Sequence, residues 1–336
     1  MTTLTMAKAI NAGLRKALEG DPHVVLMGED IGTLGGVFRV TDGLQTEFGP
    51  RRVMDSPLAE SGILGTAVGM AYRGYRPVVE IQFDGFIYPA FDQIVSQVAR
   101  MHYRTDGAVR MPITIRVPFA GGIGAAEHHS DSPEAYFAHA AGLRVVSPSD
   151  PQDAYTLIQQ AIASDDPVLY FEPKRRYHAK GEVDEAAPLA DARPMGTARV
   201  MATGGDVTLV TYGGLVQLAR DAAVAAGDEG VSVEVIDLRS LSPLDLDTVV
   251  ASVRKTGRLV VTHEAALSGG LGAEISASIT ERCFYELEHA PVRVTGHDIP
   301  YPAARLESAH LPDLDRILDG IDRVMDRPNS LSGVED

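Results

Sequence analysis

Short apolar runs alternate with longer stretches of helical periodicity along most of the chain. This alternation is typical of parallel β-sheets whose faces are covered by helices. An amphipathic helix is predicted over residues 5–18, ahead of the first apolar run. The first group of runs predicts strands at residues 23–27, 77–83, 113–118, 143–146 and 168–171. We expect these strands to form one doubly wound sheet.

A second group of apolar runs follows a change in composition. Between residues 180 and 193 the sequence is charged, rich in alanine and without clear periodicity, which indicates a linker. Beyond it, strands are predicted at residues 207–212, 231–236, 259–262 and 292–295. The sequence therefore predicts an α/β protein with two doubly wound domains, at residues 1–182 and 201–336, joined by a linker at 183–200.

Composition and charge exclude several classes of protein. A chain of 336 residues exceeds the usual size of one domain, which agrees with two cores. Its formal net charge of −16 argues against nucleic acid as a partner, because phosphate binding needs a basic face. The single cysteine, Cys283, excludes a disulfide framework and favours a reducing compartment. No apolar run is long enough to span a bilayer, and no cleavable signal is apparent, so we expect a cytoplasmic protein, or a mitochondrial one if a transit peptide was removed.

One carboxylate stands at the start of an unusually apolar helix. Residues 54–60 end a short strand and place Glu60 on the first turn of a helix over residues 61–70. That helix is too apolar and too rich in glycine for an ordinary surface helix, so we expect Glu60 to be buried at an interface. From this segment alone, a Glu60 that only complements the helix dipole is the simpler alternative.

The next segment and many later ones share their pattern with one enzyme family. After DSPLAE come IQFDGFIYPAFDQIV, AAEHHSDSPE, VVSPSDP, PVLYFEPKRRY, VIDLRSLSPLD and THEAALSGGLGAEI, and GEDIG and GGVFRVT precede them. Together these motifs resemble the β subunit of the thiamine-diphosphate-dependent 2-oxo acid dehydrogenase decarboxylases, most of all the branched-chain one. The resemblance extends over nearly the whole chain. It implies an N-terminal pyrimidine-binding domain and a C-terminal domain similar to that of transketolase.

The resemblance assigns cofactor-binding roles to several residues. It implies that Glu60 hydrogen-bonds the aminopyrimidine ring of thiamine diphosphate and activates the cofactor. Phe86 matches the position of an aromatic ring stacked on the aminopyrimidine, with a plain core phenylalanine as the alternative. Gln82 is expected either at the same pocket or in a hydrogen bond at the strand end. Leu58 and Glu29 lie on matching loops at the cofactor side.

A glycine-rich loop followed by paired histidines is the second candidate site. Residues 121–132 lack the lysine and Ser/Thr of a nucleoside-triphosphate loop, and adjacent histidines are poorly spaced to bind one metal ion. In the resembled family, the histidine at the position of His129 faces the thiazolium ring and assists acyl transfer to lipoamide. Imidazole suits this task because its ordinary pKa lies near neutral pH. A histidine that only structures the loop is the alternative.

The sequence also implies partners. It contains no Gly-Asp-Gly motif, which in complete thiamine enzymes begins the site for the divalent metal on the diphosphate. The resemblance therefore implies that a separate α subunit holds magnesium and the diphosphate, in an α2β2 heterotetramer. It also implies that the C-terminal domain docks a lipoyl acyltransferase, and an acidic surface suits a basic docking domain. Thr114 and Asp166 fall where branched-chain relatives hold potassium, which prefers oxygen ligands.

The predicted activity is thiamine-dependent oxidative decarboxylation of branched-chain 2-oxo acids, followed by transfer of the acyl group to a lipoyl group. We expect activity only with the α subunit. Pyruvate or acetoin is an alternative substrate, and a non-catalytic scaffold subunit is the alternative from another functional class. Residues 270–275 loosely suggest a dinucleotide fingerprint, but its third glycine is missing, so we interpret them as the start of a helix.

Overall fold

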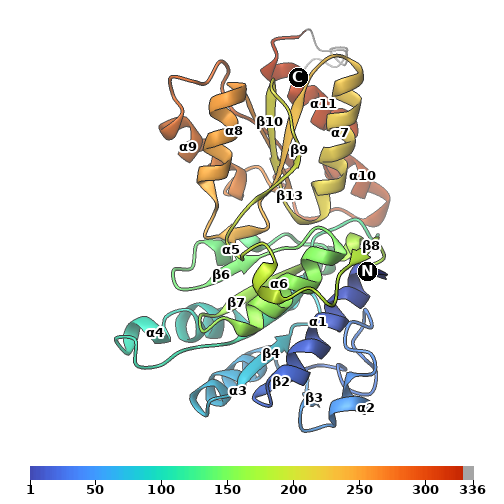
Figure 1. Cartoon of the computed structure of the whole chain (residues 1–336), viewed down its shortest axis with the longest axis vertical. Helices are drawn as coiled ribbons and strands as arrows, with labels where there is room; N and C mark the ends of the chain where they lie inside the picture. The colour runs from blue at the N-terminus through green and yellow to red at the C-terminus, as the bar shows by residue number, and fades with distance from the viewer. Residues whose placement is uncertain (328–336) are drawn as a thin grey trace. The chain divides into compact units, whose positions relative to one another are not determined.

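The computed structural model describes residues 1–327, which divide into two compact units. The first unit comprises Met1–Ile123, His128–Met195 and Leu241–Pro243. The second comprises Gly124–Glu127, Gly196–Ser240 and residues 244–327. Each unit has its own predominantly parallel sheet flanked by helices (Figure 1). The predicted α/β class with two such domains is confirmed.

A seven-stranded sheet forms the centre of the first unit, in the order β12-β6-β7-β5-β4-β2-β3. Its strands are β2 (Val24–Gly28), β3 (Val53–Asp55), β4 (Arg76–Glu80), β5 (Thr114–Phe119), β6 (Arg144–Val146), β7 (Val168–Pro173) and β12 (Ser240–Ser242). From β3 to β6 all neighbouring pairs are parallel. Residues that follow β2, β3 and β4 therefore gather at one edge of the sheet.

The predicted strand over residues 77–83 is too long. β4 ends at Glu80, although the N–H of Ile81 still donates to the carbonyl of Arg116 at 2.9 Å. The chain then turns into a 3-10 segment, η1 (Asp84–Ala90), because Gly85 and Pro89 favour turns over a continued strand. Beyond η1, residues Gln93–Val98 form a π-helix.

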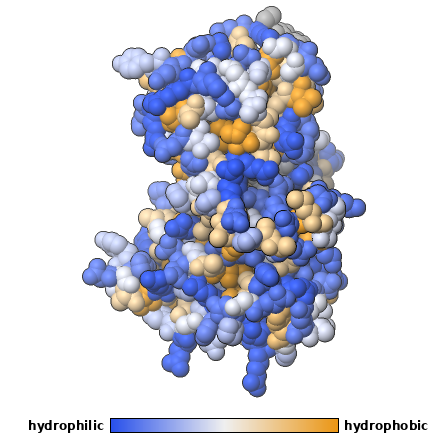
Figure 2. Space-filling model, viewed as in Figure 1, coloured by the Kyte–Doolittle hydropathy of each residue, from blue (hydrophilic) through white to orange (hydrophobic). Residues whose placement is uncertain are grey.

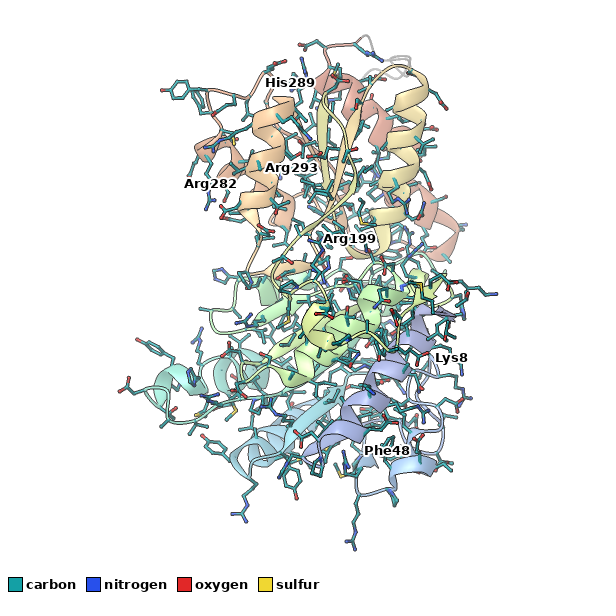
Figure 3. The ribbon with its side chains drawn as sticks, viewed as in Figure 1. Lys8, Phe48, Arg199, Arg282, His289 and Arg293 are labelled. Carbon is teal, nitrogen blue, oxygen red and sulfur yellow. The ribbon has the colours of Figure 1, made fainter. Side chains whose placement is uncertain are left out.

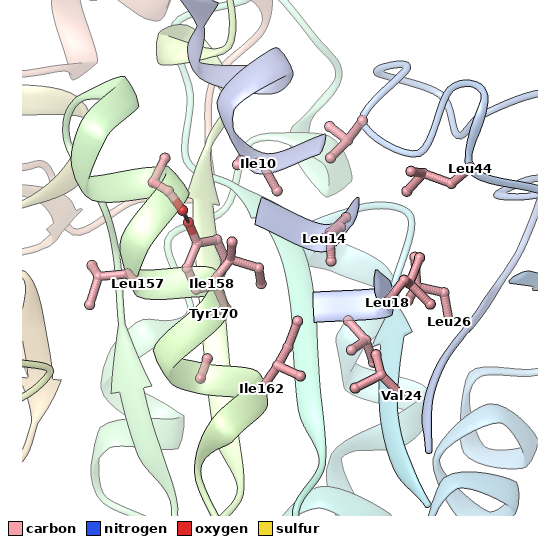
Figure 4. Close-up of a cluster of buried hydrophobic side chains, with 14 of the residues drawn as sticks. Ile10, Leu14, Leu18, Val24, Leu26, Leu44, Leu157, Ile158, Ile162 and Tyr170 are labelled. Atoms are coloured by element: carbon pink, nitrogen blue, oxygen red, sulfur yellow. Dashed lines mark hydrogen bonds between the residues drawn. The ribbon is translucent and has the colours of Figure 1, made fainter. Parts of the chain in front are cut away.

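Helices α1 (Met6–Gly20) and α6 (Pro151–Ala163) pack together over one face of this sheet. A Cβ atom on Gly13 would lie 2.4 Å from Cγ2 of Ile158, so glycine permits the close approach of the two helices. The predicted amphipathic helix is α1, and its apolar side chains enter the main core (Figure 4). The other helices of the unit are α2 (Leu44–Phe48), α3 (Glu60–Tyr72), α4 (Met101–Arg104) and α5 (Glu134–Ala138).

The segment from residue 180 is more regular than its composition indicates. Strand β8 (Lys180–Val183) pairs antiparallel with β1 (Thr2–Thr5). The sequence does not reveal this pair because each strand is short, rather polar and stabilised by a partner from the other end of the unit. Residues 183–195 belong to the first unit and residues 196–200 to the second.

A five-stranded sheet forms the centre of the second unit, in the order β14-β13-β10-β11-β9. Its strands are β9 (Arg199–Ala202), β10 (Val207–Thr211), β11 (Val233–Asp237), β13 (Leu259–Ala266) and β14 (Val292–Gly296). Its helices are α7 (Val216–Asp228), α8 (Leu246–Thr256), α9 (Leu271–Arg282), α10 (Glu307–His310) and α11 (Leu314–Val324). All four predicted strands are present, and the unpredicted β9 lies antiparallel at the edge. The start of α9 at Leu271 confirms the helix expected at residues 270–275.

Charged side chains lie on the surface of both units. Hydrophilic residues cover most of the face visible in Figure 2. Lys8 on α1 and Arg282 at the end of α9 are both exposed (Figure 3). Among the helices of residues 1–327, none is long and apolar enough to cross a membrane.

His263 ties β13 to the start of α9. Its Nε2 atom accepts the N–H of Gly272 at 3.0 Å, and its Nδ1–H donates to the carbonyl of Ala265 at 3.1 Å. The contact with Gly272 requires the neutral ring, because Nε2 accepts a hydrogen bond only when it carries no proton. Burial lowers the pKa of His263 to about 4, and the hydrogen bond to Ala265 opposes the shift only in part.

Acid is expected to destabilise the second unit through His263. Its pKa is lower in the folded state than in the unfolded state, so stability falls as the pH decreases from about 6.5 toward 4. The expected loss at pH 5 is about 2 kcal/mol. Urea unfolding of the wild type and His263→Gln at pH 7 and pH 5 measures it. The variant should be less stable at pH 7 but should lose less on acidification, and equal losses would contradict the assignment.

Candidate functional site

Glu60 is buried, as the sequence predicts. It is the first residue of α3, which follows β3 after a short loop, and 7% of its surface is exposed. The preceding residue, Ala59, offers no side-chain cap to the helix. Leu58 lies on the same loop and is 77% exposed, which leaves its apolar side chain free to contact a ligand or a partner.

Glu29 lies beside Glu60. It directly follows β2, and Gly28 pairs with Asp55 at the end of β3, so the two loops start side by side. Burial raises the pKa of Glu29, and the nearby carboxylates of Glu60 and Asp30 raise it further. Within residues 1–327, its Oε1 atom is buried without a hydrogen-bond partner. The site therefore contains a buried acceptor that a bound ligand can satisfy.

Gln82, which lies just after β4, connects this strand to the loop that carries Glu29 and Asp30. It is half-buried, and its Nε2 atom donates to Oδ2 of Asp30 at 3.4 Å. The side chain thus lies next to the loop that carries Glu29, and its carbonyl oxygen is left for another donor. This position agrees with either expected role, at the pocket or at the strand end.

Three rings form an aromatic cluster after β4. The imidazole of His129 stacks on Phe83 with 4.0 Å between ring centroids and an interplanar angle of 26°. Phe86 meets His129 edge-on at 5.1 Å and Phe83 edge-on at 6.3 Å. The two predicted residues, Phe86 and His129, are therefore in contact. Both are half-buried, so neither is an ordinary core side chain.

His129 belongs to the 3-10 turn Glu127–His129. Its Nδ1 atom lies 2.9 Å from the carbonyl oxygen of His128. Burial lowers the pKa of His129, and the neighbouring His128 and Lys174 lower it further, while the hydrogen bond to the His128 carbonyl opposes them. The ring is thus held largely neutral at physiological pH, which is the form that accepts a proton.

Thr114 and Asp166 lie where the parallel strands β5 and β7 begin, at the end of the sheet opposite to Glu29 and Glu60. Thr114 begins β5 and pairs with Val168, so Asp166 stands close to it before β7. The carboxylate of Asp166 accepts from Nη2 of Arg144 at 3.1 Å, and its carbonyl accepts from the Ser164 hydroxyl at 2.9 Å. Oδ2 and the carbonyl oxygen of Asp166 are therefore already engaged. Among residues 1–327, no three His, Cys, Asp or Glu side chains are grouped to hold a metal ion.

Two domain families match the chain, one in each half. The transketolase pyrimidine binding domain matches residues 2–180, and the transketolase C-terminal domain matches residues 196–317. A pyruvate dehydrogenase E1 component subunit beta from Leifsonia xyli subsp. xyli is 58% identical, over 96% of this chain and 94% of that protein. The chain belongs to the β subunits of the 2-oxo acid dehydrogenase E1 components. The resemblance carried by the sequence motifs is thereby confirmed.

Other relatives of this E1 β subunit have branched-chain names. A 3-methyl-2-oxobutanoate dehydrogenase subunit beta from Mycobacterium tuberculosis is 55% identical, over 97% of this chain and 93% of that protein. A 2-oxoisovalerate dehydrogenase subunit beta from Pseudomonas aeruginosa is 45% identical, over 97% and 96%. The solved structure of a split gene transketolase, described as an inactive beta4 tetramer, has a TM-score of 0.76 over 96% of this chain and 98% of its own. Its 23% identity supports a shared fold alone.

The sequence analysis missed three residues of the site in this E1 β subunit. Phe83 provides the stacking surface for His129, and the adjacent Asp84 pairs with Lys174. The available signal was an aromatic residue and an acidic residue, Phe83 and Asp84, at the end of the strand predicted over residues 77–83. Lys174, the partner of Asp84, follows β7, and nothing in the sequence indicates that positions 84 and 174 are in contact.

Proposed function

We propose that this E1 β subunit acts with an α subunit in the thiamine-diphosphate-dependent oxidative decarboxylation of branched-chain 2-oxo acids. The acyl group would pass to a lipoyl group on an acyltransferase. The observation that carries the proposal is the buried Glu60 beside Glu29, whose Oε1 atom lacks a hydrogen-bond partner within residues 1–327. Such a pair fits a ligand ring that both donates and accepts hydrogen bonds, as an aminopyrimidine does.

The neighbouring side chains fit the same ring. Glu60 would hydrogen-bond a ring nitrogen, and Phe86 would offer an aromatic surface to the ring. Gln82 and Glu29 would bond to its polar edge, while Leu58 would cover the ring at the surface. When bound, thiamine diphosphate supplies the electron sink for the loss of carbon dioxide. The side chains supply orientation and the control of one proton.

His129 is proposed to act in the transfer to the lipoyl group. Its ring is half-buried, stacked on Phe83 and largely neutral. A neutral imidazole can take up a proton at one nitrogen and return it, which suits a step in which a sulfur atom and a carbonyl group change protonation. The alternative, a histidine that only structures the loop, would leave this step unchanged in a His129→Asn variant.

The remaining partners are proposed from the family and from the sequence. Because no Gly-Asp-Gly motif occurs, we assign magnesium and the diphosphate to an α subunit in an α2β2 heterotetramer. The second unit would dock the acyltransferase, and the net charge of −16 favours a basic docking domain. Potassium at Thr114 and Asp166 stays a prediction, as does a cytoplasmic location, and no step of the proposed reaction uses potassium.

Pyruvate is the second candidate substrate. The relative from Leifsonia xyli subsp. xyli is named for pyruvate and is 58% identical, while the relative from Mycobacterium tuberculosis is named for 3-methyl-2-oxobutanoate and is 55% identical. Identities this close do not separate the two substrates. The motifs at residues 81–95 and 128–134 favour the branched-chain acids. Acetoin is a third possibility for the same cofactor.

Co-expression with the cognate α subunit is expected to give turnover that neither chain has alone. The assay follows an artificial electron acceptor with branched-chain 2-oxo acids, pyruvate and acetoin, with and without thiamine diphosphate and magnesium. Branched-chain acids should give the highest kcat/KM. Highest kcat/KM with pyruvate would overturn the substrate assignment alone. Turnover by this chain alone, or none with its cognate α subunit, would overturn the half-site proposal.

A further inference from the structure

A buried ion pair lies next to the aromatic cluster. Nζ of Lys174 donates to Oδ2 of Asp84 at 3.0 Å, and both side chains are 0% exposed. Burial raises the pKa of Asp84 to about 7, although the Lys174 charge opposes the shift. An ion pair removed so completely from water is costly unless its geometry is well satisfied. The proposed chemistry at Glu60 and His129 leaves this pair without an assigned purpose.

The pair anchors the turn that carries the two phenylalanines. Asp84 is the first residue of η1, and Phe83 and Phe86 stand on either side of Asp84 and Gly85. The N–H of Phe86 donates to the carbonyl of Phe83 at 3.0 Å, which closes the turn. Fixing the Asp84 carboxylate therefore fixes both rings that contact His129.

Gly85 brings the histidine turn directly onto η1. A Cβ atom on Gly85 would lie 2.2 Å from the carbonyl oxygen of His128, so the two backbones touch where any larger residue would collide. That same carbonyl oxygen faces Nδ1 of His129 at 2.9 Å. A carbonyl oxygen only accepts, so Nδ1 carries the hydrogen and Nε2 is the unprotonated nitrogen of the neutral ring.

We propose that the Asp84–Lys174 ion pair is the positioning device of His129. It holds η1 so that Phe83 and Phe86 orient the imidazole, Gly85 seats the His128 carbonyl, and Nε2 is left to take up the proton during acyl transfer. Asp84 and Lys174 are thus positioning residues. This inference rests on the proposed function and extends it to the source of the geometry of His129.

The ion pair also affects the charge on the ring. The titratable groups around His129 are His128 and Glu127 on its own turn, Asp84 on η1, Asp131 after the turn, and Lys174 beyond β7. His128 and Lys174 lower the pKa of His129. Asp84 is paired with Lys174, and Asp131 accepts from the Tyr88 hydroxyl at 3.0 Å. Loss of the Lys174 charge should therefore raise the pKa of His129.

The test compares two rates in the assembled enzyme with its α subunit. One is turnover with an artificial electron acceptor, and the other is acylation of a lipoyl domain; their ratio does not depend on how much enzyme has assembled. For Lys174→Met and Gly85→Ala, this ratio should fall about tenfold or more. Lys174→Arg, which keeps the charge but adds volume at a buried position, should lower the ratio less than Lys174→Met. Lys255→Met, which breaks the pair of the half-exposed Lys255 with the buried Glu234 in the second unit, should leave the ratio unchanged.

The pH profile separates positioning from a general loss of structure. The acidic limb of the lipoyl acylation rate should move to higher pH in Lys174→Met but not in Gly85→Ala, which keeps the Lys174 charge. A ratio that stays unchanged, whether or not both rates fall together, would overturn the inference while leaving the proposed function intact. If Lys174→Met does not assemble, an unchanged ratio in Gly85→Ala overturns it. A wild type without thiamine-dependent turnover would overturn the proposed function and this inference together.

Discussion

Replacing Glu60 with glutamine is expected to lower decarboxylation by the assembled enzyme by at least about a hundredfold. Glutamine keeps the length and shape of the side chain at the start of α3, but its amide cannot exchange a proton with a cofactor ring. Glu60 is buried beside Glu29, so few water molecules can take over that task. The measurement is reduction of an artificial acceptor with thiamine diphosphate, magnesium and the preferred 2-oxo acid.

Assembly has to be followed in parallel, because Glu60 lies at an expected interface. Light scattering of the variant with its α subunit should give the same mass as the wild type. Glu47→Gln is the matched control, since Glu47 is a partly exposed glutamate that pairs with Arg15 on α1. Full activity of an assembled Glu60→Gln enzyme would favour the non-catalytic scaffold subunit.

The central strands were predictable because a strand that is buried on both faces consists of a nearly continuous run of apolar residues. Runs such as residues 168–171 and 207–212 need no knowledge of their neighbours to be recognised. Strands β1, β8, β9 and β12 are short edge or paired strands, and their stability comes from the partner that each meets. The predicted end of β4 at residue 83 was wrong. The apolar run continues beyond Glu80, where the strand ends before the chain turns into η1.

The candidate site was only partly predictable. Glu60, Phe86 and His129 stand in motifs that resemble a family, so the motif order identified them. Phe83 and Asp84 stand in the same motif, but what they do depends on contacts with His129 and Lys174 from distant segments. A buried salt bridge between remote positions leaves no periodic trace in one sequence, and only the folded chain reveals it.

A second buried charge network stands at the centre of the same sheet. Arg116 on β5 bonds to Glu80 on β4 through Nη1 at 2.5 Å, and to Glu172 on β7 through Nε at 2.6 Å and Nη2 at 3.0 Å. The Tyr177 hydroxyl donates to Glu172 at 2.6 Å. Burial alone would lower the pKa of Arg116, but Glu172 and Glu80 raise it above its ordinary value. One guanidinium thus compensates two carboxylates that have almost no contact with water.

Arg116→Met is expected to lower the free energy of unfolding by about 3–5 kcal/mol, because it leaves Glu80 and Glu172 buried without their cation. Urea unfolding measures the loss. Arg144→Met is the control, since it breaks only the half-exposed pair with Asp166 and should cost less than about 1 kcal/mol. Adding Glu80→Gln and Glu172→Gln to Arg116→Met should recover part of the loss, because no buried charge then remains. A triple variant less stable than Arg116→Met would mean that the hydrogen-bond geometry of the network, and not its charge balance, stabilises the sheet.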